Sequence, residues 1–208
     1  MTSQETARGR TAAGLLASLG GLAMAATGVM QAVRPTDTDP RVLGEEHLIL
    51  ALFAASLLLL IPGLFALARR GARAARIAAG VVSAGHLPLA FGATASNLNG
   101  EDFAWFAYVA VPANLAMLAG SITMAVSLWR AGTVPRLVSA ALPVLWLCEI
   151  ILAQLGGGLI AGVYWLAVGA LLTSGTLSVR PQAAPAGPGA QNIPPGHRDQ
   201  GPARSGTG

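Results

Sequence analysis

The sequence predicts an all-α protein, a six-transmembrane helical bundle followed by a disordered C-terminal tail. Hydrophobic residues make up 53% of the 208 residues and charged residues only 11%, against about 25% charged in ordinary soluble domains. Long apolar stretches alternate with short segments that hold all 13 basic residues, every one an arginine. Because a bilayer core needs roughly 20 apolar residues per helix, these stretches are long enough to cross it.

Six windows satisfy this length, and short polar or glycine-rich segments separate them. They are residues 12–33, 48–68, 77–95, 103–128, 137–155 and 159–177. The last two windows belong to one apolar run that would be about 60 Å long as a single helix, twice the thickness of the bilayer core. The run must therefore reverse direction, and we expect the turn at Gly156-Gly157-Gly158.

The first four windows differ in how clearly they are bounded. The first follows Arg8 and Arg10 and runs for 22 residues, longer than the roughly 7–15 apolar residues of a signal peptide, so we expect a retained helix. The second is apolar almost throughout, whereas Pro88 and three glycines interrupt the third. Trp105 and Trp129 mark the two ends of the fourth, as expected of aromatic side chains at the two membrane–water boundaries.

The arginines predict the orientation of the chain. If all six windows span the membrane, Arg34 and Arg41 fall on one side and the other eleven arginines fall on the opposite side. Cytoplasmic loops collect arginine, so the sequence predicts a plasma-membrane protein with both termini in the cytoplasm. Residues 1–11 form the N-terminal segment, 12–179 the membrane domain, and 180–208 a proline- and glycine-rich tail that we expect to be disordered.

The residue types exclude several kinds of chemistry. Without lysine, the chain has neither a phosphate-binding loop of the G-x-x-x-x-G-K type nor a lysine for Schiff-base catalysis. Its three histidines and single cysteine, Cys148, are too widely separated for a zinc finger or a covalent haem attachment. The basic residues are not interleaved with aromatic ones as in a surface that stacks bases. We therefore predict no catalytic site, cofactor, metal or nucleic-acid partner.

Three polar residues at membrane depth are candidates for more than packing. His86 and Glu149 lie inside predicted spans, where an ionisable side chain costs about 2.5–3.5 kcal/mol to insert. A helical rise of about 1.5 Å per residue puts both near the midplane and Asn114 within about two turns of that depth. The cluster either holds and passes a proton or acts as a polar clamp between helices, and we favour the clamp.

Acidic and amide side chains gather in the two predicted outer loops: Asp37, Asp39, Glu45, Glu46, His47, Asn97, Asn99, Glu101 and Asp102. Oxygen-rich groups of this kind suit hard cations such as calcium. Carboxylates just before a helix also complement its positive N-terminus, which accounts for Glu45, Glu46, Glu101 and Asp102 without a ligand. We favour the second interpretation.

A face of small residues runs along the first window. Gly14, Ser18, Gly21 and Ala25 recur at spacings of three or four, and such residues let helices approach closely. The face packs either against another span of the chain or against a second copy. Beyond the lipid bilayer, the candidate partners are therefore a homo-oligomer or another membrane protein.

The stretch GATASNLNGED at residues 92–102, with Gln154-Leu155-Gly156-Gly157-Gly158 and Val163-Tyr164-Trp165, resembles uncharacterised small multi-pass membrane proteins of high-GC bacteria. The resemblance covers most of residues 45–172 and implies a compact helical bundle in a plasma membrane, but no activity. Three hypotheses follow. The leading one is a non-enzymatic, structural or partner-binding bundle. The others are a small-solute or proton-linked transporter using His86, Asn114 and Glu149, and an outward-facing sensor or metal-binding accessory using the acidic loops.

The six-window topology predicts that reporter fusions after Arg70 and after Asn99 report opposite sides of the membrane, because the third window separates them. Paired fusions to alkaline phosphatase and a fluorescent protein measure this directly. Two fusions on the same side would remove the third span and invert every later segment.

Overall fold

The computed structural model describes residues 3–34, 41–152 and 155–177. Within these ranges the chain forms six α-helices and no strand: α1 (Ser3–Val33), α2 (Glu46–Ala68), α3 (Arg73–Asn99), α4 (Phe106–Ala131), α5 (Arg136–Ile150) and α6 (Gly157–Thr173). The predicted all-α class is confirmed. The predicted tail at 180–208 lies outside the described residues, as do Asp37 and Asp39.

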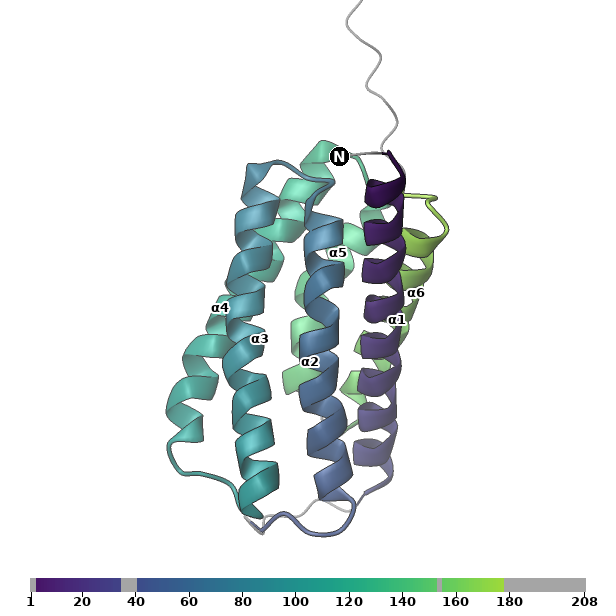
Figure 1. Cartoon of the computed structure of the whole chain (residues 1–208). Helices are drawn as coiled ribbons and strands as arrows, with labels where there is room; N and C mark the ends of the chain where they lie inside the picture. The colour runs from purple at the N-terminus through teal and green to yellow at the C-terminus, as the bar shows by residue number, and fades with distance from the viewer. Residues whose placement is uncertain (1–2, 35–40, 153–154, 178–208) are drawn as a thin grey trace, which may run out of the picture.

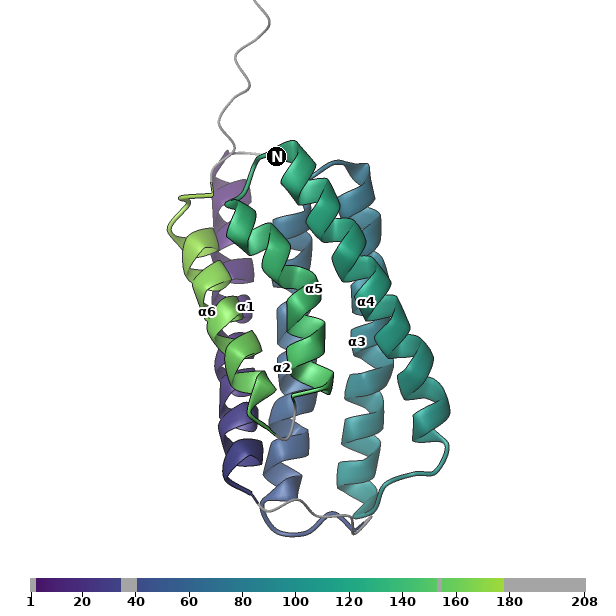
Figure 2. The same cartoon turned by 180° about the vertical axis from the view of Figure 1, so that it is seen from behind.

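The six helices form a closed ring in chain order. Each helix packs against the next one along the chain, and α6 completes the ring by packing against α1. Figures 1 and 2 show successive helices running in alternating directions, so that the ends of the ring are made of loops. Leu57, Leu60, Leu64, Met124 and Trp165 are all buried in the hydrophobic core.

Glycines form the contact between α1 and α6. Along the antiparallel pair, three glycines of α1 face three of α6: Gly14 with Gly169, Gly21 with Gly162, and Gly28 with Gly158. A Cβ added at Gly162 would lie 2.5 Å from both Gly21 O and Ala25 N, closer than real Cβ atoms come to other atoms. The small-residue face predicted in the first window therefore packs against another span of the same chain.

Four of the six helices are long enough to cross a membrane. The apolar parts of α1 to α4 comprise 26, 23, 27 and 26 residues, or about 34–40 Å at 1.5 Å per residue, which exceeds a bilayer core of about 30 Å. By contrast, α5 has 15 residues and α6 has 17, or about 22 and 26 Å. The structure is thus an apolar helical bundle with four helices that are long and apolar enough to cross a membrane, and a shorter α5–α6 hairpin.

The α5–α6 hairpin reverses direction at the predicted glycines. Gly156 adopts a left-handed conformation with φ of +85° and precedes α6 directly, a geometry that glycine adopts without steric cost. Gly157 then passes so close to the carbonyl oxygen of Cys148 that no Cβ could be accommodated. Figure 2 shows the hairpin turning before it reaches the end of the bundle formed by the α1–α2 and α3–α4 loops.

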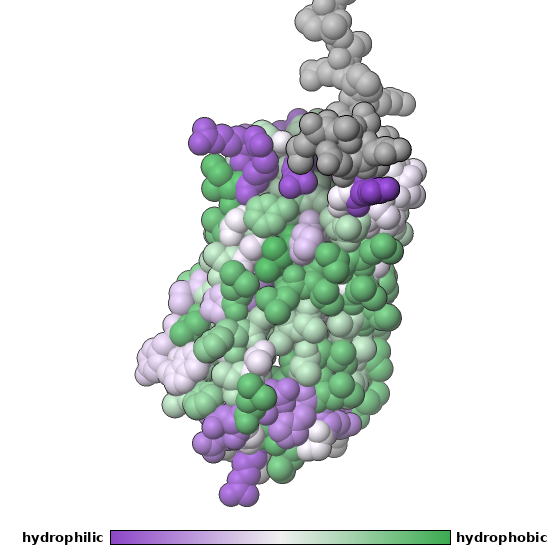
Figure 3. All heavy atoms as spheres, in the orientation of Figure 1, coloured by the Kyte–Doolittle hydropathy of each residue, from purple (hydrophilic) through white to green (hydrophobic). Residues whose placement is uncertain are grey.

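The two ends of the bundle carry opposite charge. The α1 start, the α2–α3 turn and the α4–α5 turn carry arginines, whereas the α1–α2 and α3–α4 loops carry Glu45, Glu46, Glu101 and Asp102. Those two loops are joined by the bond from Val42 N to Gly100 O, 2.8 Å long. Figure 3 shows hydrophilic side chains at both ends and a mainly hydrophobic band between them.

A methyl group added to the α1–α6 contact should destabilise the fold. In Gly162→Ala the new methyl would meet the α1 backbone, and overpacking of this kind costs about 1–3 kcal/mol. Gly80→Ala is the matched control, because nothing lies within 4 Å of its added Cβ and alanine favours a helix over glycine by about 1 kcal/mol. Thermal unfolding in detergent measures both changes. Equal stability of the two variants would show that the contact does not hold the ring closed.

Candidate functional site

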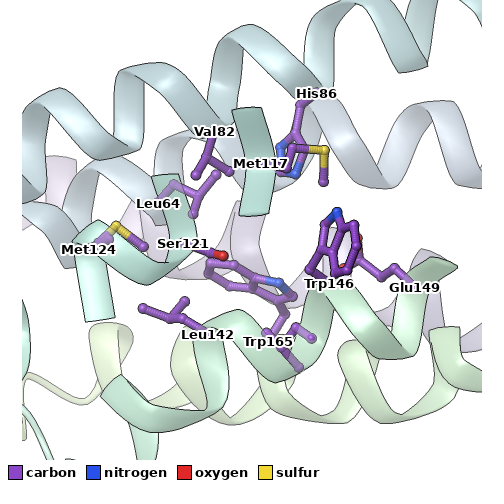
Figure 4. A pocket seen from close by; sticks show the side chains of 11 residues that line it. Leu64, Val82, His86, Met117, Ser121, Met124, Leu142, Trp146, Glu149 and Trp165 are labelled. Carbon is purple, nitrogen blue, oxygen red and sulfur yellow. The ribbon is translucent and has the colours of Figure 1, made fainter. Parts of the chain in front are cut away.

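A small cavity lies at the centre of the helix ring, and residues of α2 to α6 line it (Figure 4). Its volume is about 30 Å³, and its lining residues are Leu64, Val82, His86, Met117, Ser121, Met124, Leu142, Leu145, Trp146, Glu149 and Trp165. A water molecule needs about 10–15 Å³ of such space. The cavity therefore accommodates one or two waters and no organic solute.

His86 reaches this cavity from α3 and is only 4% exposed. Its neighbour Gly85 allows α4 to approach, since a Cβ there would lie 2.6 Å from Met117 Cγ and 2.7 Å from Ala113 O. The buried His86 Nδ1 has no hydrogen-bond partner among the described residues. A buried polar atom without a hydrogen-bond partner costs about 1–3 kcal/mol. The hydrogen-bonding capacity of this nitrogen is therefore left unsatisfied by the described residues around it.

Trp146 supplies a second unpaired nitrogen to the same cavity. Its Nε1 is buried without a hydrogen-bond partner in the described part of the chain. In Figure 4 the indole lies between His86 and Glu149, with its nitrogen on the side of His86. Trp146 and Glu149 share one face of α5 because they are three residues apart. An N–H donor and an imidazole nitrogen thus face the same small space.

Glu149 lies between this central cavity and a second, larger one. The second cavity has a volume of about 200 Å³ and is lined by Met24, Thr27, Gln31, Ile49, Leu50, Phe53, Glu149 and Gly158. No hydrogen bond or ion pair joins Glu149 to any other described residue. Of the residues that line the two cavities, Glu149 alone lines both.

The larger cavity extends toward the acidic end of the bundle. Gln31 lies in the last turn of α1, and Ile49 and Leu50 lie in the first turns of α2. Met24 and Gln31 are seven residues apart along α1, so the cavity extends over about 10 Å. Gly158, at the start of α6, also lines it, so the cavity lies beside the turn end of the α5–α6 hairpin.

On the arginine side, the central cavity is closed by apolar side chains. By their positions along the helices, Leu64, Val82 and Leu142 lie nearer the arginine-rich end than His86 and Glu149 do. Met124 on α4 lies on the same side. The polar groups of the site are therefore separated from the arginine-rich end by a hydrophobic layer.

The structure brings two of the three predicted polar-core residues together. His86 and Glu149 line one cavity, with no hydrogen bond between them among the described contacts. Asn114 does not line it and donates instead to Ala110 O of its own helix, at 2.8 Å. Tyr164, on α6, donates its hydroxyl hydrogen to Val138 O at 2.9 Å and so makes no bond to Glu149 either.

Ion pairs and hydrogen bonds within the chain hold the acidic end of the bundle together. Arg34 Nη2 lies 2.6 Å from Glu46 Oε1 and Arg34 Nε lies 3.6 Å from Glu45 Oε1. His47 Nδ1 and Asn97 Oδ1 are 2.6 Å apart. Among the described residues, no three histidine, cysteine, aspartate or glutamate side chains come together as metal ligands would.

Sequence reasoning missed Trp146, Thr27 and Gln31. Thr27 and Gln31 are four residues apart and so share one face of a helix, and Trp146 precedes Glu149 by three. From these spacings, Thr27 and Gln31 could have been assigned to one polar face of the first helix, and Trp146 to the face of the fifth that carries Glu149. Which faces meet depends on the ring order of the helices, which no local pattern specifies.

The chain matches no family model, no curated protein and no solved structure.

The site predicts the outcome of two aromatic substitutions. Trp146→Phe removes a buried N–H that has no described partner, a gain of about 1–3 kcal/mol that offsets the cost of the cavity left by the smaller ring. The free energy of unfolding should therefore change by less than about 1 kcal/mol. Tyr164→Phe keeps the ring and removes a hydroxyl bonded to Val138 O, which should cost about 1 kcal/mol. Unfolding in detergent, followed by circular dichroism, compares them. A loss above about 3 kcal/mol for Trp146→Phe, more than the smaller ring accounts for, would show that its N–H is bonded.

Proposed function

We propose that this chain is a six-span integral membrane protein of the plasma membrane, with both termini in the cytoplasm. The four long apolar helices and the arginine-rich end support this. The α5–α6 hairpin begins and ends at the same end of the bundle (Figure 2). Four spans plus a partly inserted hairpin therefore give the same sidedness of the termini as six complete spans.

For its role, we propose proton-linked transport, with Glu149 as the outer proton site and His86 as the inner one. The observation that carries the proposal is the position of Glu149 between the central cavity and the larger cavity that extends toward the acidic end. Intramembrane carboxylate and histidine side chains commonly mark proton pathways. The apolar layer formed by Leu64, Val82 and Leu142 would have to move before a proton could reach the arginine-rich end.

The cavity sizes favour a proton or a single small ion over an organic solute. The two cavities measure about 30 and 200 Å³, whereas small-molecule sites are typically about 300–1,000 Å³. A pathway for protons needs only titratable groups and a few waters between them. The transporter hypothesis is therefore narrowed to its proton-linked form.

The alternative is a non-enzymatic structural or partner-binding bundle. The glycine contacts between α1 and α6 favour it, because close backbone packing supports a rigid scaffold. In that role His86 and Glu149 would have no task beyond packing. The third hypothesis, a metal-binding accessory, loses support because Glu45 and Glu46 are engaged by Arg34.

Proton flux into liposomes tests the proposal. The purified protein is reconstituted with a pH-sensitive dye inside, and a potassium diffusion potential drives protons inward. The wild type should acidify the lumen faster than protein-free liposomes do. Glu149→Gln should return the rate to that of protein-free liposomes, because a side-chain amide neither gains nor loses a proton at neutral pH.

Glu101→Gln is the matched control, since it makes the same chemical change at an exposed loop position and should leave the flux unchanged. A wild-type rate equal to that of protein-free liposomes would favour the structural bundle. A Glu149→Gln rate equal to wild type would remove Glu149 from the pathway.

A further inference from the structure

Arg70, in the turn between α2 and α3, is the most buried arginine of the described chain. Its exposure is 8%, and its Nε and Nη1 have no hydrogen-bond partner among the described residues. The turn itself is held in place, because Thr133 Oγ1 donates to the Arg70 carbonyl oxygen at 2.6 Å. A fixed backbone thus presents a buried guanidinium group whose Nε and Nη1 donors no described residue uses.

The surroundings of Arg70 make this charge more costly. The arginines at this end whose side chains the structure describes are Arg8, Arg10, Arg69, Arg70, Arg73, Arg76, Arg130 and Arg136, with no described carboxylate side chain among them. Burial, and then the positive charge of Arg10, lowers the pKa of the Arg70 guanidinium from its usual value. Because arginine still does not lose its proton in proteins, the site holds a permanent positive charge without a counter-charge among the described side chains.

A buried charge is tolerated when an opposite charge and hydrogen bonds compensate its desolvation. The guanidinium group has five N–H donors in a planar arrangement that suits phosphate oxygens. At the membrane surface, phosphate is available both from lipid head groups and from solution. We propose that Arg70 binds a phosphate group at the arginine-rich end of the bundle, independently of the role of Glu149.

Adjacent arginines allow a matched test. Arg70→Gln removes the buried charge, and Arg69→Gln makes the same change at the neighbouring exposed position. Each detergent-purified protein is titrated with phosphatidylglycerol, with a galactosyl diacylglycerol that lacks phosphate, and with potassium phosphate against potassium chloride at equal ionic strength. Native mass spectrometry counts bound lipid, and thermal unfolding measures protection.

We expect phosphatidylglycerol or phosphate to protect the wild type and Arg69→Gln, and the phosphate-free lipid to protect neither. Arg70→Gln should bind about 10- to 100-fold more weakly, the equivalent of one charge-assisted hydrogen bond. Protection by phosphatidylglycerol alone identifies the source as a lipid head group, and equal protection by potassium phosphate identifies a free ion.

Arg70→Lys keeps the positive charge but lacks the planar set of N–H donors of the guanidinium group. It replaces Arg70→Gln in the test if that variant does not fold. It should bind with intermediate affinity. An equal loss in the variants of Arg69 and Arg70 would reduce the effect to the general positive field of this end and overturn the proposal. Absence of protection of the wild type by both phosphate compounds would overturn it as well.

Discussion

The structure depends on the close approach of α1 and α6. These helices are the first and last of the described elements, and their contact converts a row of six helices into a ring with an interior. Gly21 and Gly162 meet without side chains between them, so the backbones come into direct contact. In lipid there is little hydrophobic force to bring helices together, and van der Waals packing of this kind takes its place. The central cavity and the side chains that line it lie inside the ring that this contact closes.

The interior of that ring is not uniformly filled, because its last two helices are shorter than the others. The hairpin formed by α5 (15 residues) and α6 (17 residues) turns before it reaches the acidic end. The larger cavity lies beside the end of this hairpin, and Glu149, in the last turn of α5, borders it. A carboxylate near a helix C-terminus is electrostatically unfavourable, so the position of Glu149 in the last turn of α5 does not stabilise that helix.

Six described side chains carry buried polar atoms without a described hydrogen-bond partner: Arg70, His86, Ser96, Ser127, Ser139 and Trp146. Three of them are large: His86 and Trp146 face the central cavity, and Arg70 lies at the arginine-rich end. Other short polar side chains within the helices bond to backbone carbonyls of their own helix, as Thr27 does to Ala23 O and Asn114 does to Ala110 O, which is the usual way for such a group to be satisfied. The large side chains reach away from their own backbone, so their nitrogens depend on what lies across the space they face.

The all-α class, the approximate helix positions and the reversal of the chain at Gly156 could be predicted without a structure, because they follow from apolar length, arginine placement and glycine, all of which are local properties. The sequence also identified the small-residue face of α1, but its partner, α6, was decided by the tertiary structure. The same holds for the site. The membrane depth estimated from the sequence grouped His86, Asn114 and Glu149 as one polar cluster. In the structure, the rotation of each helix about its axis directs Asn114 to its own backbone and places Trp146 between the other two. Hydropathy also overestimated the lengths of α5 and α6, because an apolar residue in a tight turn has the same hydropathy as one within a helix. Rotation and helix ends are set by packing between elements distant in sequence, and a pattern within one segment carries no information about its neighbour.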